Sequence, residues 1–542
     1  MTTTPTQPSF HGALPPRGLD ATASSSISQG RFGRMFRHLP SSSPEDSSLA
    51  DLAKVMIQEL EPEGLDKELG VDDDDENTGK LANGELRLPA GYTYFGQFVD
   101  HDITFDPVSS LTRQNDPDGL VDFRTPRFDL DSLYGRGPSD QPYLYAPDGV
   151  HLQLGREIST PGSTVGHDLQ RNTNGRALIG DPRNDENMIV SQLQATMIQF
   201  HNTVLDLVGH ENENLGKEDV FKIAQQQVRW HYQWVVVHDF LTRLVGEDVV
   251  ADLLKPQPYL APGAGEETIV VPDLKFYAWD EDPYMPVEFS VAAYRFGHSM
   301  ARPSYLINEV ATKATPVPGT HRIPLFEPAA GVRESLSGFQ ELPDQWTVQW
   351  RFLLPGIEDA QNLPQPSYRI DAQLSHPLGA LPDAIAGPEV MGLGLEPDLA
   401  QVLAARNLFR AKRLGLPSGQ DVALAMGIEP LTDSQLFGGE NVQGLQQSTR
   451  DDLAGRAPLW FYVLKEAEVA ASSEGLGPVG GRIVAEVLIG LLAGDPLSFL
   501  GVRPNWEPTL PSATPGQFTL SDLVKFAIPT PSSPPPPPPY GG

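Results

Sequence analysis

The residues best suited to chemistry lie close together in one apolar stretch, Gly91–Asp106. Gln97, Asp100, His101 and Asp102 stand there among aromatic and aliphatic side chains, and desolvating several polar groups together is costly unless each finds a partner. In a helix, Gln97 and His101 share one face, while Asp102 points about a quarter-turn away. One face could hold a substrate and the other a cation. The stretch fits equally well a core helix with one hydrogen-bonded histidine.

A second polar pattern follows in residues 125–135. Four polar residues alternate along one edge of this segment: Thr125, Arg127, Asp129 and Asp131. Alternate positions of an extended chain can direct side-chain and carbonyl oxygens toward one point, and with Asp102 they would supply the oxygen ligands that Ca²⁺ prefers. A polar loop with Asx turns would show the same residues.

Polar residues also mark three predicted helices. Arg183 and Glu186 are three residues apart in the first turn of a helix that begins at residue 181 or 182, which puts them on one face at its positive end. His298 follows small residues that would let the backbone approach something flat or bulky, although a lone histidine there also fits an ordinary core. Asn407 is the odd polar residue of a third helix.

Composition excludes several classes of function. The 542 residues carry a formal net charge of -32, which argues against a nucleic-acid partner or an anionic membrane surface. The chain has no cysteine, so disulfides, thiolate metal sites and cysteine nucleophiles are all excluded. The most apolar run, Ile483–Ala493, is interrupted by Glu486 and is too short to span a bilayer. The first residues lack the features of a cleavable signal peptide, so we expect a cytoplasmic protein or one exported by a non-classical route.

Apolar periodicity predicts a mainly α fold with very little β structure and long loops. The expected helices are residues 48–60, 182–207, 217–245, 287–300, 398–412 and 479–493. No clear linker divides the middle of the chain, so residues 31–510 should form one domain. Residues 1–30 should be disordered. The Pro-rich residues 511–542 should form a tail, which offers a docking segment for a protein partner.

Set side by side, these motifs resemble those of the animal-type haem peroxidases of the peroxidase–cyclooxygenase superfamily, and the chain looks like a bacterial member. The resemblance rests on five ordered matches: Gln97-Phe-Val-Asp-His-Asp102, Thr125–Gly135, Arg183-Asn-Asp-Glu186, Arg295-Phe-Gly-His298 and Asn407. It implies that residues 31–510 are a large single helical haem-peroxidase domain.

The resemblance also implies a mechanism. Haem b iron would be bound by His298, whose other ring nitrogen would donate to Asn407. His101 would act as the general base on hydrogen peroxide, and Arg183 would stabilise the developing negative charge. Gln97 matches the distal residue near the halide position. The resulting oxyferryl haem would oxidise small organic donors, halides or both.

Further expectations concern the cofactors. Asp100 and Glu186 match the carboxylates that form ester links to haem in family members, and Arg295 belongs to the proximal cofactor-binding motif. Calcium would be held by Asp102, Thr125, the Arg127 carbonyl, Asp129 and Asp131, which would brace the distal helix. Asn187 stands where a methionine would be needed for a sulfonium link, so that link should be absent.

Two alternatives remain at this stage. The first is a fatty-acid dioxygenase of the same superfamily, which uses a tyrosyl radical three residues before the proximal histidine. Arg295 occupies that position here and Tyr294 lies one residue earlier, a shift of about 100° in a helix. The second is a non-catalytic, calcium-bound scaffold that uses its polyproline tail for docking, although core stability alone does not require His101, Arg183, His298 and Asn407 together.

Overall fold

The computed structural model describes residues 30–58, 88–105, 121–122, 124–158, 166–260, 266–280, 282–310, 322–326, 335–357, 364–382, 397–471 and 474–528. Two expected segments lie outside these residues: the N-terminal segment expected to be disordered, apart from Gly30, and the polyproline run Pro534–Pro539. Within them, helices dominate and the sheets are small, which confirms the expected mainly α fold. Among the described helices, none has the length and apolar character needed to cross a membrane.

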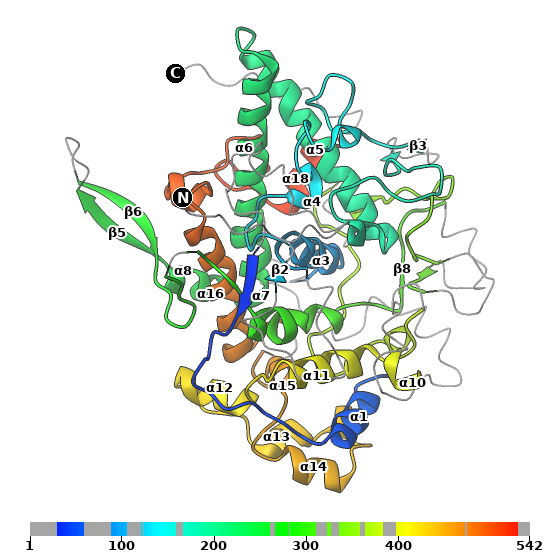
Figure 1. Cartoon of the computed structure of the whole chain (residues 1–542), viewed down its shortest axis with the longest axis vertical. Helices are drawn as coiled ribbons and strands as arrows, with labels where there is room; N and C mark the ends of the chain where they lie inside the picture. Colours follow the sequence, from blue (N-terminus) through cyan, green and yellow to red (C-terminus); the bar gives the residue numbers. More distant parts are fainter. Residues whose placement is uncertain are drawn as a thin grey trace, which may run out of the picture.

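Helix α3 lies near the middle of the structure, and the other longer helices lie around and below it in the view of Figure 1. The longer helices are α1 (Asp46–Val55), α3 (Gly91–Ile103), α5 (Met188–Glu211), α6 (Lys217–Val235), α11 (Leu403–Arg413), α12 (Gly419–Met426), α15 (Leu459–Ala470), α16 (Pro478–Gly494) and α18 (Leu520–Ala527). Shorter ones are α4 (Asp131–Tyr134), α7 (Thr242–Val245), α8 (Glu247–Leu253), α10 (Pro397–Ala400), α13 (Asp433–Phe437), α14 (Gln447–Leu453) and α17 (Phe499–Val502). In the view of Figure 1, α5 and α6 lie above α3, and α11 and α15 lie below it.

Aromatic packing fixes α3 in the core. Phe95 and Phe98 are fully buried and meet Tyr232 of α6 edge to face, with ring centroids 6.1 and 6.0 Å apart. Phe95 also contacts Phe240 at 5.6 Å. Burial of each phenylalanine contributes about 1.5–3 kcal/mol, so the polar residues of the same helix are held in fixed directions.

Several of the expected helices are not regular. The one expected at 182–207 begins with a 3₁₀ segment, η4 (Pro182–Asp185), before α5, and the one expected at 398–412 is divided into α10 and α11. The helix from Lys217 continues through a π-helical segment, η5 (Val236–Leu241), before α7. The helix expected at 287–300 consists of a π-helical segment, η6 (Glu288–Ala292), followed by a 3₁₀ segment, η7 (Ala293–His298). Such segments change the direction of side chains relative to an α-helix and occur frequently at functional sites.

In the described part of the chain, the strands form four small sheets. The first has the order β2-β1-β7, from β1 (Gly30–Gly33), β2 (Val121–Asp122) and β7 (Met285–Pro286). The others are two-stranded: β3 (Glu157–Ile158) with β4 (Gly166–His167), β5 (Leu254–Leu260) with β6 (Glu266–Pro272), and β8 (Ser304–Tyr305) with β9 (Ile323–Pro324). The hairpin β5–β6 projects from the body at the left of Figure 1.

An arm formed by residues 30–36 is bound along the body. The backbone N–H groups of Met35 and Phe36 donate to the two carboxylate oxygens of buried Glu288, at 3.0 and 3.1 Å. Arg34 donates to the carbonyl oxygens of Leu414 and Gly415, at 2.6 and 2.7 Å. The arm therefore joins the first described strand to the helix that carries Asn407.

The folded chain extends beyond the expected boundary at residue 510. Thr519 and Asp522 form a capping box at the start of α18, and Leu520, Leu523 and Val524 are buried. This helix packs against α5. The prediction of a Pro-rich tail from residue 511 is therefore wrong for residues 511–528. A short amphipathic helix among these prolines and serines supplies apolar residues to the core.

Candidate active site

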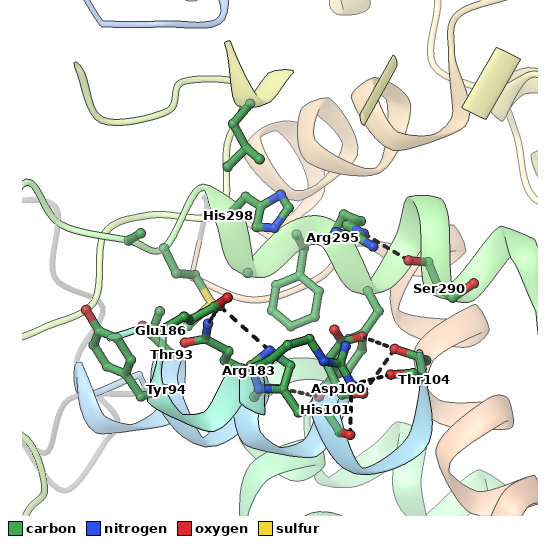
Figure 2. A pocket seen from close by; sticks show the side chains of 18 of the residues that line it. Thr93, Tyr94, Asp100, His101, Thr104, Arg183, Glu186, Ser290, Arg295 and His298 are labelled. Carbon is green, nitrogen blue, oxygen red and sulfur yellow. Dashed lines mark hydrogen bonds and ion pairs between the residues drawn. The ribbon is translucent and has the colours of Figure 1, made fainter. Parts of the chain in front are cut away.

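A cavity of about 400 Å³ lies between α3 and the segment η7. Figure 2 shows His101 on α3 and His298 on η7, on opposite walls of this cavity. Most of the cofactor and catalytic residues expected from the sequence line it: Gln97, Asp100, His101, Arg183, Glu186, Arg295 and His298. Segments separated by up to 200 residues thus meet at one site.

On the proximal wall, His298 Nδ1 lies 2.8 Å from Asn407 Nδ2. The amide nitrogen donates in this orientation, and a half-turn of the amide would present its oxygen to a protonated Nδ1, as a metal at Nε2 requires. Burial, followed by the charge of Arg295, lowers the pKa of His298 to about 3, so the ring is neutral. Arg295 itself donates from Nε to the carbonyl of Ser290 at 2.9 Å.

On the distal wall, His101 Nδ1 lies 2.7 Å from Asn184 Oδ1, and its Nε2 lies 3.8 Å from Glu186 Oε1. Gln97 donates to the same Glu186 oxygen. Burial, followed by the charge of Arg183, lowers the pKa of His101 to about 4, whereas burial raises that of Glu186 to about 7. His101 is therefore neutral near pH 7 and able to accept a proton.

Arg183 is fixed by contacts on two sides. Its Nη2 donates to the carbonyl oxygens of His101 and Thr104, at 3.0 and 2.6 Å, and to Asp181 at 2.8 Å. The guanidinium carbon lies 4.6 Å from the ring centre of Phe105. Asp100, which also lines the cavity, accepts from the Thr104 hydroxyl at 3.1 Å.

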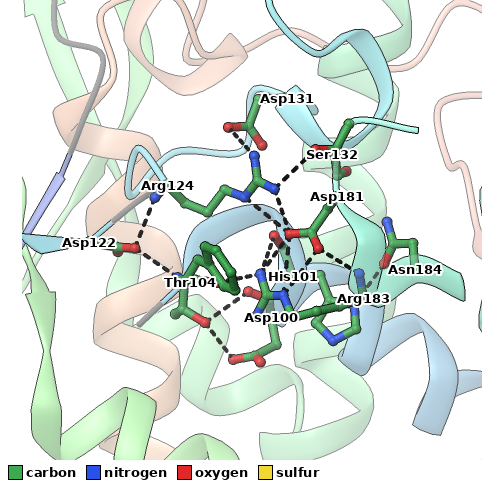
Figure 3. Close-up of polar contacts among 12 residues, drawn as sticks. Asp100, His101, Thr104, Asp122, Arg124, Asp131, Ser132, Asp181, Arg183 and Asn184 are labelled. Atoms are coloured by element: carbon green, nitrogen blue, oxygen red, sulfur yellow. Dashed lines mark hydrogen bonds and ion pairs between the residues drawn. The ribbon is translucent and has the colours of Figure 1, made fainter. Parts of the chain in front are cut away.

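A buried chain of ion pairs extends from Arg183 through Asp181 and Arg124 to Asp131 (Figure 3). Asp181 also accepts from Arg124 at 2.7 Å, and Arg124 donates to Asp131 at 3.0 Å. Burial would raise the pKa of Asp181, but the charges of Arg183 and Arg124 hold it well below its usual range. Asp181 therefore stays ionised and shared between two arginines.

Three buried carboxylates form a candidate cation site. Oxygen atoms of Asp102, Asp129 and Asp131 lie within 4.8 Å of one another. Asp102 Oδ1 and Asp131 Oδ1 are buried without a hydrogen-bond partner in the described part of the chain. Burial, and then the charges of Asp129 and Asp131, raise the pKa of Asp102 well above its usual range. Orphaned buried oxygens and mutual repulsion are what a bound cation would relieve.

The other two expected calcium ligands are placed less directly. The Thr125 hydroxyl donates to Asp129 Oδ2 at 2.8 Å, so it lies next to the cluster. Arg127 is buried, and its guanidinium lies 3.5 Å from Asp282. Leu130 adopts a positive φ of 57°, which turns the chain so that Asp129 and Asp131 approach Asp102 together.

Sequence reasoning missed the residues that hold the candidate catalytic groups. Asn184, Asp181 and Arg124 are buried, and each contacts a predicted functional residue or its partner. Asn184 lies inside the Arg183–Glu186 motif, and that position was the only available signal. Tyr294 was expected to be turned away from the position used by oxygenases, yet it lines the cavity and donates to the Gly96 carbonyl at 3.1 Å. The π and 3₁₀ segments change the direction that an α-helix would give it.

Part of the chain is similar in sequence to known proteins. Residues 112–341 match the animal haem peroxidase family. Dual oxidase 1 of Caenorhabditis elegans is 25% identical over 137 residues, and the dual oxidase of Drosophila melanogaster is 25% identical over 126 residues. These matches cover 25% and 23% of this chain but only 8% and 7% of the two oxidases.

Solved structures resemble the whole fold. Peroxidase A from Dictyostelium discoideum gives a TM-score of 0.55 at 14% identity, with 92% of each chain covered. Fatty acid alpha-dioxygenase from Arabidopsis thaliana gives 0.51 at 16% identity, covering 90% of this chain and 76% of that one. The dioxygenase from Oryza sativa gives 0.50 at 14% identity, covering 80% and 74%. Residues 112–341 thus match the animal haem peroxidase family, and the fold of the chain resembles those of peroxidase A and the two alpha-dioxygenases.

Proposed function

We propose that this protein is a haem peroxidase, which reduces hydrogen peroxide and oxidises small organic donors or halides. The observation that carries the proposal is the pair His101 and His298 on opposite walls of one cavity, both kept neutral by burial. One neutral imidazole can bind a metal while the other accepts a proton. Arg183 adds a fixed positive charge beside the proton acceptor.

The residues of the cavity fit haem b. His298 would supply the iron ligand, with its ring oriented by Asn407. Arg295 and Arg410 bring positive charge to the cavity wall, which suits the carboxylate groups of haem. Asp100 and Glu186 both line the cavity, as ester links to the haem methyls would require. Bound haem would supply the iron centre at which peroxide is reduced.

The chain's own groups would handle protons and charge. His101 Nε2 would take a proton from peroxide and hold it near Glu186 Oε1. Nη1 of Arg183 has no hydrogen bond among the described residues, so it is available to stabilise negative charge in the cavity. Gln97 would hold a halide or an organic donor near the same position.

We further propose that Asp102, Asp129 and Asp131 bind calcium, with Thr125 and the Arg127 carbonyl completing the site. Three carboxylates and neutral oxygens are a hard-ligand set that suits Ca²⁺. Because Asp102 follows His101 directly, the ion would stabilise the end of α3 that carries the proton acceptor. Calorimetric titration of calcium-free protein with Ca²⁺ tests this assignment, and an absence of binding would contradict it.

The test of the peroxidase proposal is the absorption spectrum of haem-loaded protein before and after one equivalent of hydrogen peroxide. His298→Ala should lose the Soret band, because the iron ligand is removed. His101→Ala should keep the band and react with peroxide about 10²–10⁴ times more slowly, the range expected for a lost general base. His210→Ala, an exposed histidine on α5, is the matched control and should change neither property. Folded wild type without a Soret band would favour the non-catalytic scaffold.

A fatty-acid dioxygenase remains a second candidate because Tyr294 lines the cavity. Burial raises the pKa of Tyr294 well above its usual range, so its phenol keeps its proton until it is oxidised. Oxygen uptake with a long-chain fatty acid, compared between wild type and Tyr294→Phe, separates the two activities. Uptake that Tyr294→Phe abolishes, without loss of peroxide-driven donor oxidation, would favour the dioxygenase.

A further inference from the structure

A buried chain of three hydrogen bonds begins at the back of His101. His101 Nδ1 meets Asn184 Oδ1 at 2.7 Å (Figure 3), Asn184 Nδ2 donates to Gln194 Oε1 at 2.8 Å, and Gln194 Nε2 donates to the Ser132 carbonyl at 3.2 Å. Asn184, Gln194 and Ser132 have no exposed surface, and His101 is 4% exposed. This chain of hydrogen bonds thus links α3, η4 (Pro182–Asp185), α5 and α4 through the interior.

The Ser132 carbonyl, at the end of this chain of hydrogen bonds, determines which group donates and which accepts in each of them. The Ser132 carbonyl can only accept, so the amide nitrogen of Gln194 must face it. The Gln194 oxygen then faces Asn184, whose nitrogen must donate. The Asn184 oxygen is consequently left facing His101, and only a protonated Nδ1 can satisfy it. The unprotonated Nε2 is then directed toward the cavity and Glu186.

We propose that Asn184 and Gln194 are positioning residues that hold His101 as the Nδ1–H tautomer, with the lone pair of Nε2 presented to the cavity. The proposal rests on the proposed function, in which Nε2 takes the proton of peroxide. The opposite tautomer would present an N–H group to peroxide and could not accept that proton. Neither residue needs to touch the substrate, because both act through the imidazole.

Substitution of Gln194 can distinguish this positioning role from simple packing. Its amide is two hydrogen bonds away from His101, and it is absent from the cavity wall. Gln192 lies on the same helix, is also buried, and donates to the His167 carbonyl at 2.7 Å. Gln194→Met and Gln192→Met therefore remove the same group from the same helix, but only Gln194→Met breaks the chain to His101.

The first experiment needs no haem. Ring-nitrogen NMR of ¹⁵N-histidine-labelled apoprotein at one neutral pH reports which nitrogen of each imidazole carries the proton, and His101→Gln identifies the His101 signals. Wild type, Gln192→Met and Asn184→Asp should show the Nδ1–H tautomer, since a carboxylate at 184 still accepts from Nδ1. Asn184→Leu and Gln194→Met should lose it or show a mixture.

The second experiment uses haem-loaded protein and measures the rate of cyanide binding, because hydrogen cyanide must give its proton to Nε2 before the anion binds. We expect a fall of about 10- to 100-fold in Asn184→Leu and a smaller fall in Gln194→Met, below the loss expected when a general base is removed outright. Gln192→Met should bind cyanide at the wild-type rate. Circular dichroism establishes that each variant is folded.

The outcomes separate the two proposals. An Nε2–H tautomer in wild type, or an Nδ1–H tautomer retained in both Asn184→Leu and Gln194→Met, would overturn the positioning role. If Asn184→Leu does not fold, Gln194→Met decides the question against its Gln192→Met control. A wild-type protein that takes up no haem would refute the proposed function, while the apoprotein spectra would still decide the tautomer.

Discussion

Replacing Asp102 with asparagine should change the stability of the protein in opposite directions with and without calcium. Oxygen atoms of Asp102, Asp129 and Asp131 lie within 4.8 Å of one another. At that separation and an effective dielectric constant near 20, each ionised pair repels by about 3.5 kcal/mol. Uptake of a proton by one carboxyl limits the repulsion, so we expect Asp102→Asn to stabilise the calcium-free protein by about 1–2 kcal/mol.

With calcium present the order should reverse. At a calcium concentration about 1,000 times its Kd, binding stabilises wild type by about 4.1 kcal/mol. If loss of one carboxylate raises Kd about 100-fold, the same concentration stabilises the variant by only about 1.4 kcal/mol. The binding loss of about 2.7 kcal/mol exceeds the gain from reduced repulsion, so the variant should be less stable than wild type by about 1 kcal/mol.

Urea unfolding in chelator and in excess calcium measures both differences. Asp522→Asn is the matched control, because this buried aspartate caps α18 away from the cluster. Its effect should not depend on calcium. An Asp102→Asn variant that is destabilised equally in both conditions would refute both the repulsion and the cation site.

Three further changes have defined outcomes. Burial lowers the pKa of His231 to about 4, and its neutral ring accepts from the N–H groups of Thr509 and Leu510. This ring therefore stabilises the fold above pH about 6.5, and the contribution is lost as pH falls toward 4. His231→Gln should flatten the pH dependence of the urea midpoint between these values, and an unchanged slope would contradict this expectation. Gly338→Ala would place Cβ 1.8 Å from the Asp185 carbonyl oxygen, so it should lower the free energy of unfolding, measured by thermal unfolding, by about 1–3 kcal/mol. Gly216→Ala is the control and should lower it less, because no atom lies within 4 Å of the added Cβ. Asp181→Asn removes the carboxylate shared by Arg124 and Arg183, so it should lower the free energy of unfolding in urea by about 3–5 kcal/mol. A decrease below about 1 kcal/mol would show that the chain of ion pairs is not needed for stability.

The sequence was most informative where chemistry and helix periodicity coincide. Gln97, His101 and Asp102 lie within one helix, so their spacing alone placed two of them on the cavity side and the third toward a cation site. His298 and Asn407 lie 109 residues apart, and their pairing was expected only from the resemblance to a family. The structure brings their side chains together.

Residues that act through long-range contacts could not be predicted. Asp181 meets Arg124 across 57 residues, and Asn184 meets His101 across 83, with no local pattern to mark either pair. The π and 3₁₀ segments before His298 were also missed, because apolar periodicity does not distinguish them from an α-helix. Helix α18 was hidden for a different reason: its Pro- and Ser-rich surroundings suggested a tail.

The arm of residues 30–36 has a consequence for the order in which the chain can fold. Its polar partners lie 252 to 381 positions later, at Glu288, Leu414 and Gly415, and Phe32 forms part of the cavity wall. During synthesis, this segment therefore leaves the ribosome long before the surface that receives it exists. Contacts of such sequence separation are slow to form, and domains of this size commonly fold through intermediates. The cavity therefore cannot close on that side until the chain has been synthesised past Gly415, and until then strand β1 and Glu288 lack the partners that they have in the folded protein.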